Sequence, residues 1–227
     1  MRKNNTRKIR LFVDFDGTVT NKDVGNSIID KFLPPGLIKQ GWHEKILEEW
    51  KTGKISSEEC LTLEFKNCKV TEEEFNTELD TFTLTPGFIE TVQYCRNHDI
   101  PIMILSDGLD YYIEYILAKY DISAVDYRSN HMYFCNGCLE IEFPYIDKGC
   151  GRCGNCKRWH IEKLRRDGDL VIYAGDGYSD RFAIRSAEVV FARRDLADFC
   201  EKEDLKYIHY NNFNDLLDYF EETNGTV

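Results

Sequence analysis

The sequence predicts an α/β protein with a doubly wound parallel sheet and a small helical block inserted after the first strand. Short apolar runs rich in strand-forming residues occur at residues 8–15, 100–105 and 170–174, and each run leads into a polar motif. Segments with helical periodicity separate the later runs, and such alternation is typical of a parallel sheet. Between the first two runs, several helical segments follow one another without a strand, which indicates an insertion.

Length and charge limit what the chain can do. It has 227 residues, of which 42% are hydrophobic and 13% aromatic, enough for one large domain or a main domain with an insertion. Its net charge of −11 repels nucleic-acid backbones and anionic lipids, so neither is expected as a partner. The same charge repels phosphate esters. A site for such an ester therefore needs positive charge from a metal ion and a lysine.

The N-terminal segment and the cysteines indicate the compartment. The first residues are basic and then apolar for only a short stretch, which is not the pattern of a signal peptide. No run reaches the roughly 18 apolar residues of a membrane span. We therefore expect a cytoplasmic protein. Its nine cysteines are then expected to be thiols or metal ligands rather than disulfides.

The first strand ends in the motif DFDGT at residues 14–18. Burial of an unpaired carboxylate at a strand end is costly, and a metal ion would explain it. Asp14 could attack phosphorus and form an aspartyl-phosphate, and Asp16 could protonate the leaving oxygen and then activate water. The alternative is a simple turn, since Asp and Gly are common in turns.

The second and third strands also end in polar motifs. Ser106, Asp107 and Gly108 follow the second strand, where a hydroxyl and backbone N–H groups could bind a phosphoryl group or merely cap a helix. Asp176 and Asp180 follow the third strand in the sequence GDGYSD. Because ligands bind at the carboxyl ends of parallel strands, these motifs are expected to lie beside the first one.

The acidic residues predict a magnesium site, because Mg²⁺ prefers oxygen ligands. Asp14, Asp176 and the backbone carbonyl of Asp16 would suffice, with Asp180 binding the metal through water or holding Lys157. Lys157 opens a helix ahead of the third strand. An isolated lysine is usually a surface residue, but a cation at this place would neutralise charge that develops during phosphoryl transfer.

The remaining elements follow from the same patterns. Helices in the inserted block are predicted near residues 24–32, 37–50, 57–67 and 72–81. Elsewhere, helices are predicted near residues 87–97, 110–119, 157–166 and 179–186, with short strands at 189–192 and 206–209. Asn136 and Gly137 predict the turn of a hairpin over residues 133–143, within a cysteine-rich excursion of residues 125–156.

The ordered set of motifs resembles the haloacid dehalogenase superfamily of phosphatases. The resemblance implies a Rossmann-like core of residues 1–20 and 84–227, and a cap of residues 21–83 that closes over substrate. It implies a magnesium cofactor and a small-molecule phosphate ester as substrate. The implied roles are nucleophile for Asp14, acid and base for Asp16, phosphate binding for Thr18, Ser106, Asp107 and Lys157, and metal binding for Asp14, Asp16, Asp176 and Asp180.

Within the superfamily the chain is similar to the phosphoserine-phosphatase-like branch. More narrowly it resembles phosphatases of methionine salvage, which act on a phosphorylated keto-pentenyl intermediate, and phosphoethanolamine/phosphocholine phosphatases. Residues 14–23, 150–157 and 190–193 carry this resemblance. Phosphoserine phosphatases usually have Glu where this chain has Asp23, which weakens the amino-acid-phosphate alternative. Asp23 and the aromatic region of Tyr111 and Tyr112 are candidate specificity contacts.

The cysteines form a second constellation, with one CxxC unit and one CxxCxxC unit in the excursion. This spacing predicts a structural zinc site, which would position Lys157 directly after the last cysteine. Five residues compete for four places: Cys135, Cys138, Cys150, Cys153 and Cys156. Unligated thiols are the alternative reading, and an iron–sulfur cluster is less favoured.

Three functions therefore stand beside one another. The first is a phosphomonoesterase, supported by the intact set of acids and lysine. The second is a zinc-stabilised binding module without turnover, and the third is a phosphotransferase that uses the same site. An ATP-binding function is disfavoured because no GxxxxGK[ST] loop occurs. The oligomeric state does not follow from these patterns.

Overall fold

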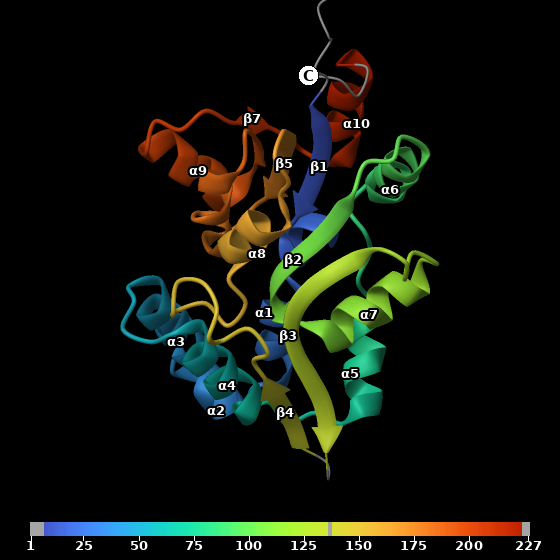
Figure 1. The fold of residues 1–227 in the computed structure, drawn as a ribbon. Coiled ribbons are helices and arrows are strands. Elements are labelled where there is room, and N and C mark those ends of the chain that lie inside the picture. The colour runs from blue at the N-terminus through green and yellow to red at the C-terminus, as the bar shows by residue number, and fades with distance from the viewer. Residues whose placement is uncertain (1–6, 136–137, 224–227) are drawn as a thin grey trace, which may run out of the picture.

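The computed structural model describes residues 7–135 and 138–223, and its α/β fold confirms the predicted class (Figure 1). Within that part of the chain, seven strands form one sheet in the order β4-β3-β2-β1-β5-β6-β7. All neighbouring strands run parallel except β3 and β4, which are antiparallel. The strands are β1 (Lys8–Val13), β2 (Ile102–Leu109), β3 (Asp126–Cys135), β4 (Cys138–Glu142), β5 (Asp169–Gly175), β6 (Val189–Ala192) and β7 (Ile208–His209).

The central strands are apolar because both faces of the sheet are covered. Leu11 on β1 lies opposite Ile102 on β2 and Ile172 on β5. Leu11 packs in the larger core cluster, whereas its neighbour Phe12 packs in a second cluster on the other face. Successive side chains of a strand point to opposite faces, so a strand covered on both sides reads as a continuous apolar run.

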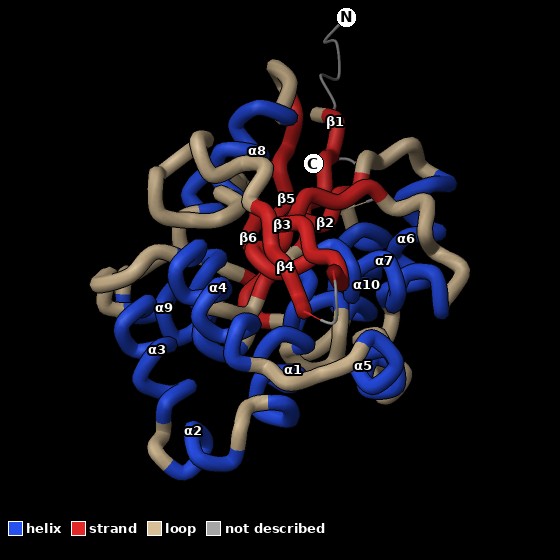
Figure 2. Tube along the Cα trace, turned by 90° about the horizontal axis from the view of Figure 1, so that it is seen from below, coloured by secondary structure: helices blue, strands red, loops and turns tan. Residues whose placement is uncertain are grey.

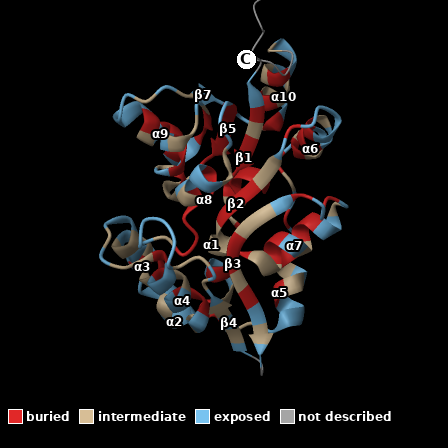
Figure 3. Ribbon diagram, in the orientation of Figure 1, coloured by how far each residue is buried: buried red, intermediate tan, exposed pale blue. Residues whose placement is uncertain are grey.

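Helices fill both faces. The larger cluster includes buried residues of α6 (Phe88–Asn97), α7 (Asp110–Lys119) and α10 (Phe213–Glu222). The second cluster includes residues of α8 (Lys157–Leu164) and α9 (Arg194–Lys202). Figure 3 shows buried positions concentrated on the central strands and on the helix faces that contact them. The described helices include none that is long and apolar enough to cross a membrane.

Five helices lie beyond the carboxyl ends of the strands (Figure 1), and Figure 2 shows the same helices from below. They are α1 (Val24–Phe32), α2 (Pro35–Lys39), α3 (Trp42–Lys51), α4 (Ser57–Asn67) and α5 (Glu72–Leu79). The two ends of this block meet at an antiparallel bridge between Thr20 and Leu84. Backbone bonds from Asn21 N–H to the Thr83 carbonyl and from Thr85 N–H to the Val19 carbonyl reinforce the junction.

The hairpin formed by β3 and β4 reaches from the sheet toward the inserted helices. Phe134 on β3 makes edge-on ring contacts with Phe75 of α5 and Tyr111 of α7. The parallel first half of β3, which pairs with β2, was not predicted from sequence. The predicted turn at residues 136–137 lies outside the described residues.

Three predicted elements were wrong in detail. The single helix near residues 37–50 is two helices, because Gly41 has a left-handed φ of 60° between them. The helix near residues 179–186 is two short 3-10 turns, η2 (Tyr178–Asp180) and η3 (Ala183–Ser186). Strand β2 does not end before the serine motif but continues through it to Leu109, with an irregular register beyond Leu105.

Candidate active site

Asp14 follows β1 directly and is 4% exposed. Its carboxylate Oδ1 accepts a hydrogen bond from the Phe15 N–H at 2.7 Å, at the start of the turn η1 (Phe15–Val19). The Lys157 ammonium lies 2.5 Å from the same oxygen. Among the described residues both hydrogen bonds of this carboxylate use Oδ1, so Oδ2 remains available for another partner.

Lys157 is the first residue of α8 and is 3% exposed. Besides Asp14, its ammonium contacts Asp180 Oδ1 at 2.6 Å and the Ser179 hydroxyl at 2.9 Å. Burial alone would lower the pKa of this lysine, but the two carboxylates outweigh burial and raise it. Lys157 is therefore a fixed cation at the end of β1.

Asp180 holds the turn after β5. Its Oδ2 accepts hydrogen bonds from the N–H groups of Asp176 at 3.1 Å and Gly177 at 3.0 Å, and its Oδ1 also accepts one from the Tyr173 hydroxyl. It is fully buried. These bonds, together with Lys157, occupy both oxygens, so Asp180 positions the lysine and the turn.

Asp176 lies at the edge of the same site. Its Oδ1 accepts a hydrogen bond from the Thr18 hydroxyl at 3.0 Å, and its Oδ2 lies 2.9 Å from the Arg194 guanidinium. Gly17 has a φ of 70°, and a Cβ there would lie 2.5 Å from Asp176 Oδ2. Glycine in the DFDGT motif therefore permits both the turn and this close approach.

Asp16 is enclosed by donors from three directions. Its Oδ1 accepts hydrogen bonds from the first N–H groups of α1, at Val24 (3.0 Å) and Gly25 (3.3 Å). Its Oδ2 accepts one from the Tyr112 hydroxyl at 2.9 Å and one from the Ser106 hydroxyl at 3.2 Å. Burial still raises the pKa of Asp16 above its ordinary value, which favours a carboxyl group that can hold a proton.

A cavity of about 290 Å³ lies between the strand ends and the inserted helices. Its floor is formed by residues after β1 and β5 and by the last part of β2, and includes Asp14, Asp16, Ser106 and Asp176. Its opposite wall comes from α1, α3 and α4. That wall combines apolar side chains with two acids, Asp23 and Glu64, and one lysine, Lys51. The cavity therefore joins a reactive floor to a wall that can contact the rest of a small molecule.

The model of the haloacid dehalogenase-like hydrolase family matches residues 11–185. The chain belongs to this family. A relative from Brevibacillus brevis, named 2-hydroxy-3-keto-5-methylthiopentenyl-1-phosphate phosphatase, is 32% identical over 93% of this chain and 95% of its own length. A relative of the same name from Lysinibacillus sphaericus is 31% identical, with 93% of each chain covered.

Solved structures agree with the fold of this haloacid dehalogenase-like hydrolase. A phosphoserine phosphatase with an analogue of a phospho-aspartyl intermediate superposes with a TM-score of 0.70 at 22% identity. It covers 94% of this chain and 99% of that chain. The substrate-bound phosphoserine phosphatase gives a TM-score of 0.68 with the same coverage. The predicted family, its phosphatase type and its fold are thus confirmed.

The acids of the hydrolase fit a magnesium ion. Carboxylate oxygens of Asp14, Asp176 and Asp180 lie within 4.8 Å of one another. Burial, together with the charge of Asp180, raises the pKa values of Asp14 and Asp176. A divalent cation would offset this repulsion, and oxygen donors suit Mg²⁺. Arg194 contacts Asp176 with a side chain that is 49% exposed, so it can move aside.

The structure places some of the predicted site residues in the cavity lining and others outside it. Asp14, Asp16, Ser106 and Asp176 line the cavity together. Thr18 is not among the residues that line it, and its hydroxyl is buried against Asp176; its contact with phosphate stays a prediction.

Asp107 lines the cavity but has other partners. Its carboxylate accepts hydrogen bonds from the Ser57 hydroxyl of α4 at 2.7 Å and the Asn155 N–H at 2.8 Å. Asp107 connects the inserted helices to the loop before α8, and its contact with phosphate stays a prediction.

The cysteines separate into two groups. The sulfur atoms of Cys150, Cys153 and Cys156 lie within 4.8 Å of one another. Cys135 and Cys138 face each other across the β3–β4 hairpin and are not members of that group. A single site that mixes the two groups is therefore not formed in this conformation.

Sequence reasoning missed several residues of the site. Tyr112 donates to Asp16, Arg194 contacts Asp176, and Glu64 is 3% exposed in the cavity wall. The sequence predicted Tyr112 only as a specificity contact within an aromatic region, not as a partner of Asp16. A buried Glu on a helix gives a weak signal, since helical acids are usually solvent-exposed.

Proposed function

We propose that the protein is a magnesium-dependent phosphomonoesterase that hydrolyses a small-molecule phosphate ester through an aspartyl-phosphate on Asp14. The observation that carries the proposal is the arrangement around Asp14. A buried carboxylate at a strand end has one oxygen held by Lys157 and the Phe15 N–H, and it shares a cavity floor with Asp16. A nucleophile, a cation and an acid thus meet at one place.

In the first step, Asp14 Oδ2 attacks phosphorus and the bond from phosphorus to the ester oxygen breaks. Asp16 gives its proton to that oxygen, which leaves as an alcohol. In the second step, water attacks the phosphorus of the aspartyl-phosphate, Asp16 takes the proton from water, and Asp14 is released with inorganic phosphate. The raised pKa of Asp16 supports its part in both steps.

The other residues orient the reacting groups and neutralise their negative charge. Lys157 keeps its charge beside Asp14, and Ser106 contributes its hydroxyl at the cavity floor. Asp14, Asp176 and the backbone carbonyl of Asp16 would hold magnesium, with Asp180 supporting them. When bound, this ion would stabilise charge on the phosphoryl oxygens. Zinc has no part in these steps.

We assign residues 21–83 to a cap over the site. The Thr20–Leu84 bridge marks where the block leaves and re-enters the core. Its helices supply the apolar cavity wall through Ile29, Leu47 and Phe65. Closure of such a wall would exclude water from the reacting groups.

The methionine-salvage ester is the first candidate substrate. It is named in relatives that are 30–32% identical over more than nine-tenths of both chains. The cavity favours a second candidate class, phosphate esters that carry an ammonium group, such as phosphoethanolamine, phosphocholine and phosphoserine. Asp23 and Glu64 are the reason, because two acids face the space beyond the reacting groups. Burial beside Asp16 raises the pKa of Asp23 to about 7.

A panel of these esters tests the proposal. We expect magnesium-dependent phosphate release by the wild type, none in excess chelator, and recovery when magnesium is restored. Asp198→Asn is a matched control, because this aspartate is exposed on α9. Asp198→Asn should match the wild type, and Asp14→Asn should be inactive.

The panel also separates the other functions. Phosphate release that depends on an added acceptor alcohol, with a phosphorylated alcohol as product, would indicate a phosphotransferase. Absence of turnover with every ester would favour the binding-module alternative.

A further inference from the structure

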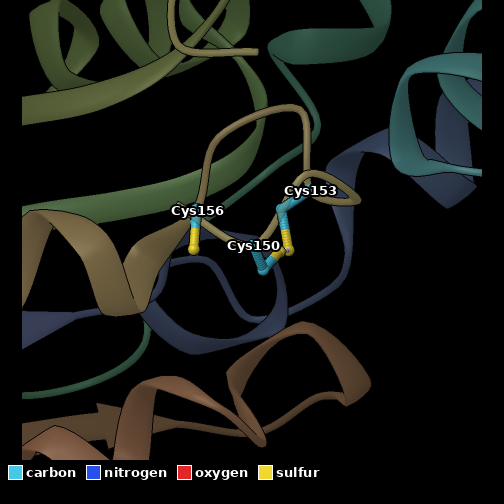
Figure 4. Close-up of side chains that lie close together, drawn as sticks. All are labelled: Cys150, Cys153 and Cys156. Carbon is cyan, nitrogen blue, oxygen red and sulfur yellow. Dashed lines mark hydrogen bonds between the residues drawn. The ribbon is translucent and has the colours of Figure 1, made fainter. Parts of the chain in front are cut away.

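The loop before α8 brings three thiols together. Cys150, Cys153 and Cys156 converge so that their sulfur atoms lie within 4.8 Å of one another. The Cys150 and Cys153 sulfurs are 3.3 Å apart. Figure 4 shows these two sulfurs side by side, with Cys156 on the other limb of the same loop. The buried cysteines of the helices, such as Cys95 and Cys200, belong instead to the apolar core clusters.

The backbone of the loop is shaped around Cys156. Gly149 and Gly151 have φ values of 79° and 71°, a region that favours glycine. A Cβ at Gly149 would lie 2.5 Å from the Cys156 sulfur, so only glycine allows this approach. The Cys156 sulfur also accepts backbone N–H bonds from Cys150 and Trp159. Such donors stabilise a thiolate rather than a thiol.

Metal binding by this cluster would release protons, because the thiolate is the form of cysteine that binds a metal ion.

We propose that Cys150, Cys153 and Cys156 form a binding site for one thiophilic divalent cation of the zinc class. Three thiolates would occupy three positions of a tetrahedral ion, and water or another small ligand would occupy the fourth. Thiolates select zinc over magnesium, whereas the carboxylates of the phosphatase site have the opposite preference. The two sites therefore take different metals.

The position of the loop gives such an ion a structural role. The Arg152 carbonyl accepts a hydrogen bond from the Ser57 N–H of α4 at 2.9 Å. Asn155 bonds to the Asp107 carboxylate and to the Ser106 carbonyl. Cys156 immediately precedes Lys157. An ion that fixes the loop would thus hold the catalytic lysine and one contact of the inserted helices.

Cobalt titration tests the site independently of phosphatase activity. The full-length chain is reduced, freed of metal and titrated with Co²⁺ in excess Mg²⁺, which fills the carboxylate site. We expect a thiolate-to-cobalt charge-transfer band that saturates near about one equivalent and disappears when Zn²⁺ is added. Cys150→Ser and Cys153→Ser should each weaken Zn²⁺ binding at least about tenfold in competition with a chromophoric chelator.

Cys138→Ser is the matched control, because Cys138 is an exposed cysteine on the hairpin outside the cluster. It should bind like the wild type. Circular dichroism checks that each variant is folded, and Cys150→Ser is expected to fold because its side chain is exposed. Loss of binding in folded Cys150→Ser with retention in Cys138→Ser supports the proposal.

Three results would overturn it. The first is no charge-transfer band from the fully reduced wild type. The second is unchanged binding in both Cys150→Ser and Cys153→Ser, which would place any metal elsewhere. The third is a Cys150–Cys153 disulfide in the isolated protein that, once reduced, binds no metal; the cluster would then be a redox pair. None of these results bears on phosphate release.

Discussion

The Lys157 ammonium lies 2.5 Å from Asp14 Oδ1 and joins the start of α8 to the end of β1. Both side chains are more than nine-tenths buried. A buried pair of this kind is costly to break from one side only, because the remaining charge has no compensation. In this protein the ion pair places a fixed cation beside the proposed nucleophile.

Lys157→Met should therefore damage both stability and turnover. Asp14 and Asp180 lose their shared cation, so we expect the free energy of unfolding to fall by about 3–5 kcal/mol and kcat by about 10²–10³-fold. Lys163→Met, an exposed lysine on the same helix, is the control. Thermal unfolding and phosphate release measure the two effects. If folded Lys157→Met had the kcat of the wild type, the lysine would have no role in the mechanism.

Tyr112→Phe tests the acid–base role of Asp16 through pH. The Tyr112 hydroxyl donates to Asp16 and favours its charged form, so removing it should raise the pKa of Asp16. The step that needs protonated Asp16 would then persist to higher pH, and the basic limb of the kcat profile should shift upward. Tyr115→Phe, whose hydroxyl bonds to exposed Asp80, should leave the profile unchanged. A downward shift in Tyr112→Phe would refute the assignment.

Gly108→Ala should disturb the same acid sterically. A Cβ at Gly108 would lie 1.7 Å from the Tyr112 hydroxyl and 2.7 Å from Asp16 Oδ2, so one of these groups must move. We expect a loss of about 1–3 kcal/mol in stability from overpacking and a clear fall in kcat/KM. Gly36→Ala is the control, since a Cβ there meets nothing within 4 Å. Equal kinetics for both variants would contradict the described packing.

His160 should make stability depend on pH. Its Nε2 lies 2.6 Å from Asn155 Oδ1, and burial lowers its pKa from 6.5 to about 4. Between these values the unfolded chain binds more protons than the folded one, so stability is full above pH 6.5 and falls as the pH drops toward about 4. His160→Gln should make the free energy of unfolding, measured with urea, depend less on pH in this range, whereas His98→Gln should not. If the free energy of unfolding changed with pH equally in the wild type and in His160→Gln, this would contradict a neutral, buried His160 in the folded protein.

Strand-end motifs were predictable because local sequence dictates them. Apolar runs followed by DFDGT and GDGYSD define buried strands that end in acids, and topology then brings those acids together. Gly41 divides one predicted helix in two, and hydrophobic periodicity alone does not reveal this break.

Other features depend on long-range contacts. Asp107 bonds to Ser57, fifty positions away in the chain, and Tyr112 bonds to Asp16 at a separation of 96. No local pattern encodes such pairings. For the same reason, the division of the cysteines into Cys150, Cys153 and Cys156 on one side and the hairpin pair on the other could not be read from spacing.

The most direct test of the central claim is to trap the covalent intermediate. A radiolabelled phosphate ester that the wild type hydrolyses is mixed with enzyme and magnesium, quenched in acid, and the labelled peptide is identified. The account predicts label on the peptide containing Asp14, no label in Asp14→Asn, and phosphate release by that variant reduced more than about 10³-fold. Release by Asp14→Asn at the wild-type rate would contradict it.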